Sequence, residues 1–216
     1  MHEQYQDQFK HVSEDLTEMS RLVETAMSKA TKSLLDANLT LADEVIAGDD
    51  VIDALADKVE NETMAILARY QTFAGDLRLL AGALKISGTL ERMGDLASHV
   101  AKQAKLRHPN VSVPREFLET FSKMGDIANE VIRRSTKAIA DGDIKQAADI
   151  ARAEAQMDAL HRELFSQVLS DDWSHGVEAA IDITLLSRYY ERFADHGEAL
   201  ARRVAYILTG DMPAKE

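Results

Sequence analysis

The sequence predicts an all-α protein of six long helices, arranged as a tandem duplication of two antiparallel three-helix bundles. Three observations support this fold class: prolines are rare, apolar residues recur at helical spacing, and the second half of the chain repeats the pattern of the first. Proline costs about 3 kcal/mol inside a helix. The chain has only 3 prolines, at positions 109, 114 and 213, so its long proline-free stretches favour helix.

The first half of the chain predicts three helices. Between Val12 and Leu34, apolar side chains follow one another at intervals of three or four residues, which is the core stripe of a helix. A break follows at 36–38, where Asn38 is suited to cap the next helix. That second helix is expected to end near Tyr70. A third helix is expected from about 76 to 107, with its apolar stripe running through the middle of the segment.

The second half repeats this plan after a linker that contains two prolines. When the chain is shifted by 105 residues, the segment 53–55 (DAL) falls on 158–160 (DAL). When it is shifted by 100 residues, 90–95 (LERMGD) falls on 190–195 (YERFAD), so the connection before the last helix is five residues shorter. The expected helices of this half are 115–140, 144–169 and 177–209. The expected organisation is a first repeat at 1–108, a linker at 109–114, a second repeat at 115–212 and a tail at 213–216.

Composition and charge exclude several classes of function. Hydrophobic residues make up 45% of the chain and charged residues 29%, which is typical of a globular protein. The net charge of −12 disfavours binding to nucleic acids and to anionic membranes. The absence of cysteine removes disulfides, thiolate zinc sites and cysteine nucleophiles. Because the sequence shows neither a targeting segment nor an apolar run long enough to span a membrane, we expect a soluble, cytoplasmic protein.

Pairs of acidic residues recur four residues apart in both halves of the chain. On a helix this spacing places both carboxylates on one face, where like charges destabilise an isolated helix by about 0.2–0.5 kcal/mol. Each pair points away from the apolar stripe of its helix, and neighbouring helices could bring two pairs together. Such an all-oxygen cluster suits Mg²⁺, Mn²⁺, Ca²⁺ or carboxylate-bridged iron. The simpler interpretation is a solvated acidic face, and the pattern alone leaves both open. The pairs are Asp49/Asp53, Glu91/Asp95, Glu154/Asp158 and Glu191/Asp195.

Other residues give weaker indications of function. His99, His161 and His196 lie close to acidic residues in the sequence and could complete an iron or zinc site, although partly exposed helix histidines are more common. The sequence contains no GxxxxGK[ST] loop, GxSxG elbow or HExxH motif. It therefore predicts no enzyme.

The two Glu-Arg-x-x-Asp segments, at 91–95 and 191–195, resemble those of the PhoU family of phosphate-transport regulatory proteins. The turn from Gln71 that ends in Asp-Leu-Arg at 76–78 is similar as well. The resemblance extends over nearly the whole chain and implies two three-helix bundles with metal clusters on their surfaces. It assigns the eight acidic residues of the four pairs as ligands and leaves the metal open among Fe, Zn, Mn and Mg. In the second repeat Arg162 stands in the place of Asp57, so the two clusters are expected to differ in nuclearity or occupancy.

The resemblance also implies a function. Members of the family couple the phosphate ABC transporter, chiefly its ATPase subunit, to a sensor histidine kinase, and they hold the phosphate-starvation response off without catalysing a reaction. We further expect a homodimer, the commonest oligomer. Two alternatives remain: a ferritin-like oxidase or storage protein, and a plain helical scaffold. The first normally requires paired Glu-x-x-His motifs that face a helical core, and the sequence has no such pair.

Overall fold

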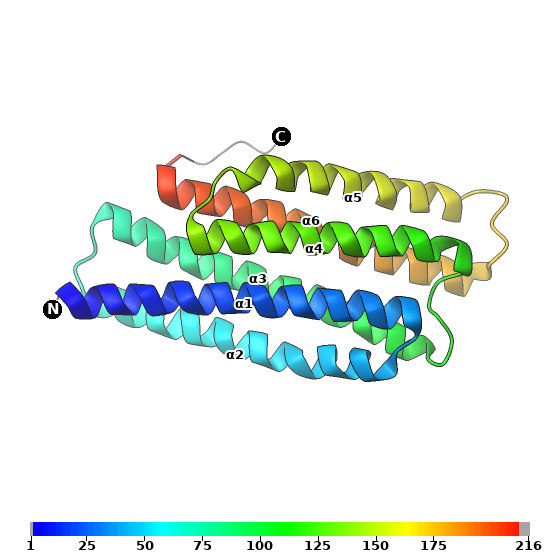
Figure 1. Cartoon of the computed structure of the whole chain (residues 1–216), viewed down its shortest axis with the longest axis horizontal. Helices are drawn as coiled ribbons and strands as arrows, with labels where there is room; N and C mark the ends of the chain where they lie inside the picture. The colour runs from blue at the N-terminus through cyan, green and yellow to red at the C-terminus, as the bar shows by residue number, and fades with distance from the viewer. Residues whose placement is uncertain (1, 212–216) are drawn as a thin grey trace.

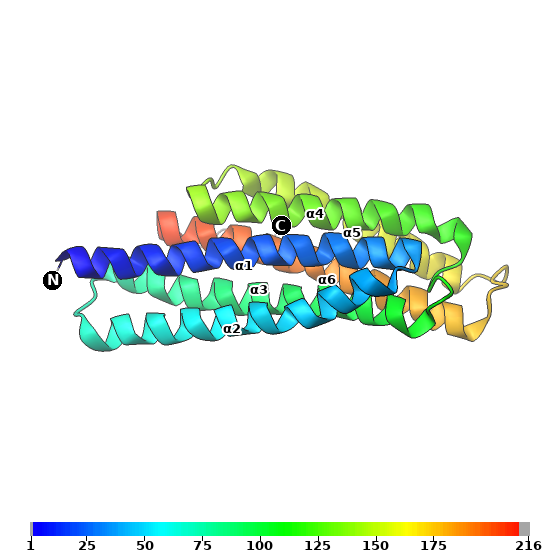
Figure 2. The same cartoon turned by 60° about the horizontal axis from the view of Figure 1, so that its bottom comes forward.

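The computed structural model describes residues 2–211, and their side chains from residue 6 onward. Six long helices run roughly along one axis of an elongated molecule (Figures 1 and 2). The predicted all-α fold is confirmed, and each of the five helices after the first begins within three residues of its expected position. The elements are α1 (His2–Asp36), α2 (Leu39–Arg69), α3 (Ala74–Arg107), the short 3-10 helix η1 (Arg115–Phe117), α4 (Leu118–Asp141), α5 (Gln146–Val168) and α6 (Gly176–Thr209).

Local side chains explain where helices begin and end. The Asn38 side chain accepts a hydrogen bond of 3.1 Å from the backbone N–H of Leu41, so it caps α2 as predicted. The start expected at residue 144 is wrong by two residues. Gly142 ends α4 in the left-handed region, with φ of 64°, and the Asp143 carboxylate accepts from the backbone N–H of Lys145. The chain is therefore still turning at 143–145, and α5 begins after it.

Both halves of the chain contribute to one continuous core. Helices α1, α2 and α3 pack on one another, as do α4, α5 and α6, and the halves meet through α1 against α4 and α3 against α6. The central helices α1, α3, α6 and α4 thus form a ring. Helix α2 lies in the groove between α1 and α3, and α5 lies in the groove between α4 and α6. The division into two repeats with a linker at 109–114 stays a prediction about how the chain is organised.

Close helix contacts hold this ring together. The whole stripe of α1 from Val12 to Leu34 is buried, as its spacing predicted. Between α1 and α4, a Cβ on Gly125 would lie 2.4 Å from the methyl group of Thr31, so only glycine fits there. The hydroxyls of Thr31 and Tyr190 form a buried hydrogen bond of 2.8 Å that links α1 to α6. None of the described helices is sufficiently long and apolar to cross a bilayer.

Candidate metal centre

The acidic residues of α2 are brought against those of α3 by a close helix contact at Gly94. A Cβ on Gly94 would lie 3.0 Å from Cδ1 of Ile52 and 3.4 Å from Oδ1 of Asp49. Ile52 belongs to the buried stripe of α2, and Asp49 lies one turn earlier. The missing side chain therefore lets the Asp49 carboxylate approach the backbone of α3, beside the Glu91/Asp95 pair.

The four predicted residues of the first half form one electrostatic cluster, which we call the first cluster (Asp49, Asp53, Glu91, Asp95). Burial raises the pKa of Asp49, and Asp95 raises it further, whereas the Ser98 hydroxyl lowers it. Burial also raises the pKa of Asp53, followed by repulsion from Asp49 and Asp95. The pKa of Glu91 is raised by burial and then by Asp53 and Asp95. Asp95 thus disfavours the charge on each of the other three carboxylates.

The second cluster (Glu154, Asp158, Glu191, Asp195) differs from the first because one of its carboxylates forms an ion pair with an arginine. Burial raises the pKa of Glu191, and Asp195 and Asp158 raise it further, so three of the four predicted residues interact. Arg188 opposes this effect: its Nη1 donates to Oε1 of Glu191 at 2.5 Å. Glu154 is half-buried on α5, one turn before Asp158.

The three candidate histidines lie on α3 (His99), α5 (His161) and α6 (His196). Nδ1 of His161 lies 3.0 Å from Oγ of Ser187, and burial lowers the pKa of His161. Burial also lowers the pKa of His196, and the nearby guanidinium of Arg192 lowers it further. His99 stacks on Tyr189, with 5.2 Å between the ring centroids. Each ring thus has a neighbour other than a carboxylate.

The donor chemistry of both clusters fits a hard cation. All the acidic donors are oxygens, and in the second cluster Oε2 of Glu191 is buried without a hydrogen-bond partner. In the positions that these side chains occupy, however, no three acidic or histidine residues among those described are arranged to hold a metal ion. An ion would therefore require side-chain rotations that turn the carboxylates toward one another.

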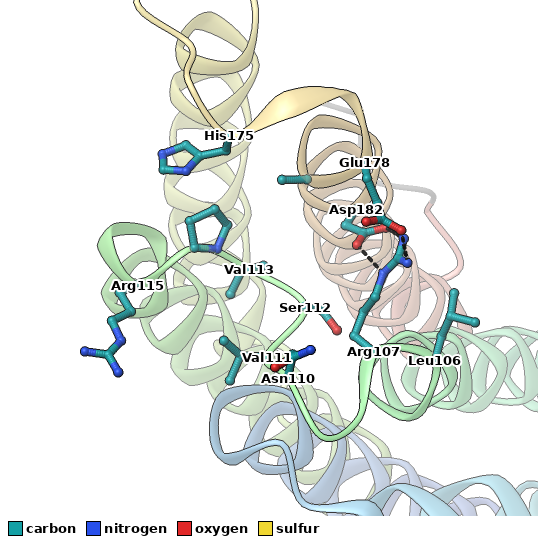
Figure 3. A pocket seen from close by; sticks show the side chains of 12 residues that line it. Leu106, Arg107, Asn110, Val111, Ser112, Val113, Arg115, His175, Glu178 and Asp182 are labelled. Atoms are coloured by element: carbon teal, nitrogen blue, oxygen red, sulfur yellow. Dashed lines mark hydrogen bonds and ion pairs between the residues drawn. The ribbon is translucent and has the colours of Figure 1, made fainter.

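A second polar site lies where the connection after α3 passes the start of α6 (Figure 3). It lines a hollow of about 610 Å³. The Arg107 guanidinium donates to both oxygens of Asp182, from Nε at 2.7 Å and from Nη2 at 2.9 Å, and Gln103 donates to Oδ1 at 2.7 Å. Arg107 also pairs with Glu178. Because Asp182 is 3% exposed, these bonds neutralise a buried charge and bind the end of α3 to α6.

Sequence reasoning missed this site, although one signal for it exists. Under the shift of 100 residues that aligns the two halves, Asp182 falls on Gly82. In the structure Gly82 admits the side chain of Ile207, whereas Asp182 receives Arg107. The contacts between α3 and α6 therefore differ at the two ends of the pair: one end is apolar and the other is an ion pair. The sequence signal for this difference is an acidic residue in one repeat that aligns with a glycine in the other.

Comparison with known proteins gives consistent results. The family model described as "PhoU domain" matches residues 16–104 and 121–204, so the two matches begin 105 residues apart and end 100 residues apart. The PhoU homolog 2 of Mycobacterium tuberculosis, named a phosphate-specific transport system accessory protein, is 42% identical over 97% of this chain and 98% of its own. A PhoU homolog of Aquifex aeolicus is 34% identical over 95% of this chain and 93% of its own.

Solved structures agree on the fold. The crystal structure of PhoU from Pseudomonas aeruginosa superimposes with a TM-score of 0.87 and 29% identity, covering 96% of this chain and 100% of that one. The PhoU structure from Streptococcus pneumoniae has a TM-score of 0.84 at 22% identity, covers 98% of this chain and 100% of that one, and supports the fold alone. With the family model matched in both halves and relatives aligned over almost the full length, the chain belongs to the PhoU family.

Proposed function

We propose that this chain is an accessory regulator of phosphate transport. The observation that carries the proposal is the 42% identity, over 97% of the chain, to a protein named as a phosphate-specific transport system accessory protein. The fold suits a role in binding, because it presents long helical faces and the sequence has no recognised catalytic motif. We infer that the protein acts without catalysis, in the cytoplasm and as a homodimer.

The finer part of the proposal concerns partners. The chain would link the ATPase subunit of the phosphate ABC transporter to a sensor histidine kinase and keep the phosphate-starvation response off when phosphate is plentiful. In cells that lack the chain, starvation genes should then be expressed at high phosphate, and the wild-type gene should restore repression. The purified protein should bind the ATPase subunit and the cytoplasmic part of the kinase. Unchanged expression together with no binding to either partner would refute the adaptor role.

We further propose that the first cluster binds one or more divalent metal ions, of Fe, Zn, Mn or Mg. The second cluster would bind such ions more weakly. Two observations support this: mutually repelling carboxylates in the first cluster, and a buried Glu191 oxygen without a partner in the second. Elemental analysis of protein purified without chelators should find stoichiometric metal. The D49N/D53N variant should lack the metal that the first cluster binds. The matched control is E60Q/D126N, which removes two exposed acidic residues elsewhere on α2 and α4.

The same measurement separates the alternatives. A plain scaffold should carry no stoichiometric metal, and D49N/D53N should then behave like the control. A ferritin-like oxidase should consume O₂ when Fe²⁺ is added, whereas a regulator should bind iron without turnover. Metal bound equally by D49N/D53N and by wild type would place the ion somewhere other than the first cluster.

A further inference from the structure

A cavity opens at the end of the bundle where α1 and α3 begin and α4 and α6 end (Figures 1 and 2). Each of the four helices of the central ring contributes residues to its lining, so it lies between them and not on an outer face. Its volume is about 330 Å³, roughly twice that of an engineered apolar cavity of about 150 Å³ that holds benzene. The cavity is therefore large enough for a small ligand.

Small side chains on α3 and α4 leave this space open. Ala83 and Ala138 are both buried, and both line the cavity. One turn further into the bundle, Met19 of α1 meets Ser87 of α3, with 3.8 Å between Sδ and Oγ. Both of these residues are buried, so the core is filled again beyond this point. The cavity is thus closed on its inner side and opens at the end of the ring.

The floor of the cavity is wholly aliphatic. Its buried residues carry neither a ring nor a polar side chain, and no lining residue has a side-chain polar atom that is buried without a partner. A buried water molecule needs two to four polar partners, which these side chains do not offer, whereas hydrocarbon needs none. We call this space the ring-end cavity, and its floor consists of Val12, Leu16, Ala83, Ile86, Ala138 and Val204.

The mouth of the ring-end cavity is largely apolar as well. Leu79 and Leu208 line it and are 37% and 52% exposed, so they extend the apolar surface toward solvent. Among the lining residues Lys10 alone is charged. It pairs with Glu14 at 3.5 Å, and both side chains are mostly exposed. An ion pair in water contributes little, so the charge at the mouth does not decide what enters.

We propose that the ring-end cavity binds the alkyl chain of a small amphiphile. A flexible chain can fill the aliphatic floor while its polar head stays in water at the mouth, beside Ser13 and Lys10. An aromatic ligand would find no ring to stack on in the floor. A fatty acid and a fatty alcohol share this chain, and the test distinguishes them. The cavity shares no residue with the carboxylate clusters, so the proposal is independent of metal binding and of the regulatory role.

The test titrates the full chain with 1-hexanol, 1-heptanol and 1-octanol by isothermal titration calorimetry. The affinity should rise about fourfold with each added methylene, because each one leaves water for an apolar site. The heat capacity change should be negative, as it is when apolar surface is buried. Nonanoate carries the same eight-carbon chain as octanol and should bind within about threefold of it, because charge at the mouth contributes little.

Two pairs of variants locate the binding site. Ala83→Leu fills the floor and should weaken octanol binding at least tenfold or so, whereas the matched control Ala81→Leu makes the same change on the exposed side of α3 and should leave binding unchanged. Leu208→Ser changes the mouth and should weaken binding about three- to tenfold. Its control, Leu169→Ser, alters an exposed leucine in a separate apolar hollow between α5 and α6 and should have no effect. If Ala83→Leu melts far below wild type, the second pair decides, because Leu208 is exposed.

Each other outcome would overturn the proposal. Equal weakening within either pair of variants would mean that octanol binds to apolar surface in general. An affinity that does not rise with chain length would mean that no hydrocarbon is buried. Binding of nonanoate without binding of octanol would identify an anion site at Lys10 instead. Self-association that both octanol and Leu208→Ser abolish, measured by sedimentation, would make a second copy of the chain the occupant.

Discussion

Replacing Asp95 by asparagine should have opposite effects with and without metal. The substitution keeps the size of the side chain and removes one negative charge from the first cluster. Asp95 raises the pKa of three other carboxylates, those of Asp49, Asp53 and Glu91. In metal-free protein, Asp95→Asn therefore relieves repulsion. In metal-loaded protein, the same change removes a ligand.

The stability gained by relieving repulsion and the stability lost with the metal ligand differ enough in size to be distinguished. Repulsion between neighbouring carboxylates on helices costs about 0.2–0.5 kcal/mol per pair. Three pairs, screened because Asp95 and Asp53 are exposed, amount to about 0.5–1 kcal/mol. For a chain of this size that raises the melting temperature by about 1–4 °C. A metal present at 100 times its dissociation constant stabilises the wild type by about 2.7 kcal/mol, or roughly 5–10 °C, and the variant should lose most of this gain.

Thermal melting of wild type and Asp95→Asn, each with and without Mn²⁺, Fe²⁺, Mg²⁺ or Zn²⁺, is the assay. Glu60→Gln is the matched control, since Glu60 is an exposed acidic residue of α2 that does not act on the cluster. We expect metal to raise the melting temperature of wild type and control alike, and to raise that of Asp95→Asn much less. An equal metal response in all three proteins would refute the assignment of the first cluster. A small stabilisation of Asp95→Asn under every condition would support a merely solvated acidic face.

Three further predictions follow from packing and charge. Tyr190→Phe removes one partner of the buried hydrogen bond to Thr31 and should cost about 1–2 kcal/mol in chemical denaturation, and adding Thr31→Val should recover part of that loss. Gly197→Ala should cost about 1–3 kcal/mol, because its Cβ would lie 2.0 Å from a valine methyl of α4; an unchanged midpoint would contradict the packing. Since the pKa values of Asp49 and Glu91 are raised on folding, these groups should make metal-free protein more stable as pH falls from neutrality toward their ordinary values of 3.8 and 4.5. D49N/E91Q should lack this gain in denaturation measured across pH, and metal-loaded protein should show the opposite trend because protonation displaces the ion.

The parts of the fold that depend on local pattern could be read from the sequence. The spacing from Val12 to Leu34 identified both the first helix and its buried face. The cap at Asn38 needed only a residue type and its position. The error at the start of α5 has a local cause too, since the Asp143 side chain binds the backbone N–H of Lys145 in a turn that propensity does not resolve.

The parts that depend on contacts between distant segments could not be read in this way. The spacing of Glu91 and Asp95 showed that they share a face. Their approach to Asp49, however, depends on how closely another helix, α2, packs on α3 at Gly94. The pairing of Arg107 with the buried Asp182 joins residues 75 positions apart, and no local rule signals it. Likewise, the antiparallel packing of α3 on α6 places Arg92 beside residues of the other half of the chain.

The duplication explains why the two clusters should not respond equally to metal. At the position where the first half has Gly88, the second half has Arg188, and this guanidinium already donates to Glu191. At the position of Asp57, which adds to the repulsion on Glu91, the second half has Arg162. A cation from the solvent must compete with Arg188 for Glu191, whereas the cations near the first cluster, such as Lys102 and Arg92, form no ion pair with it among the described residues. Repulsion that no hydrogen-bonded cation relieves makes the gain from binding larger, so the metal response of the whole protein should come chiefly from the first cluster.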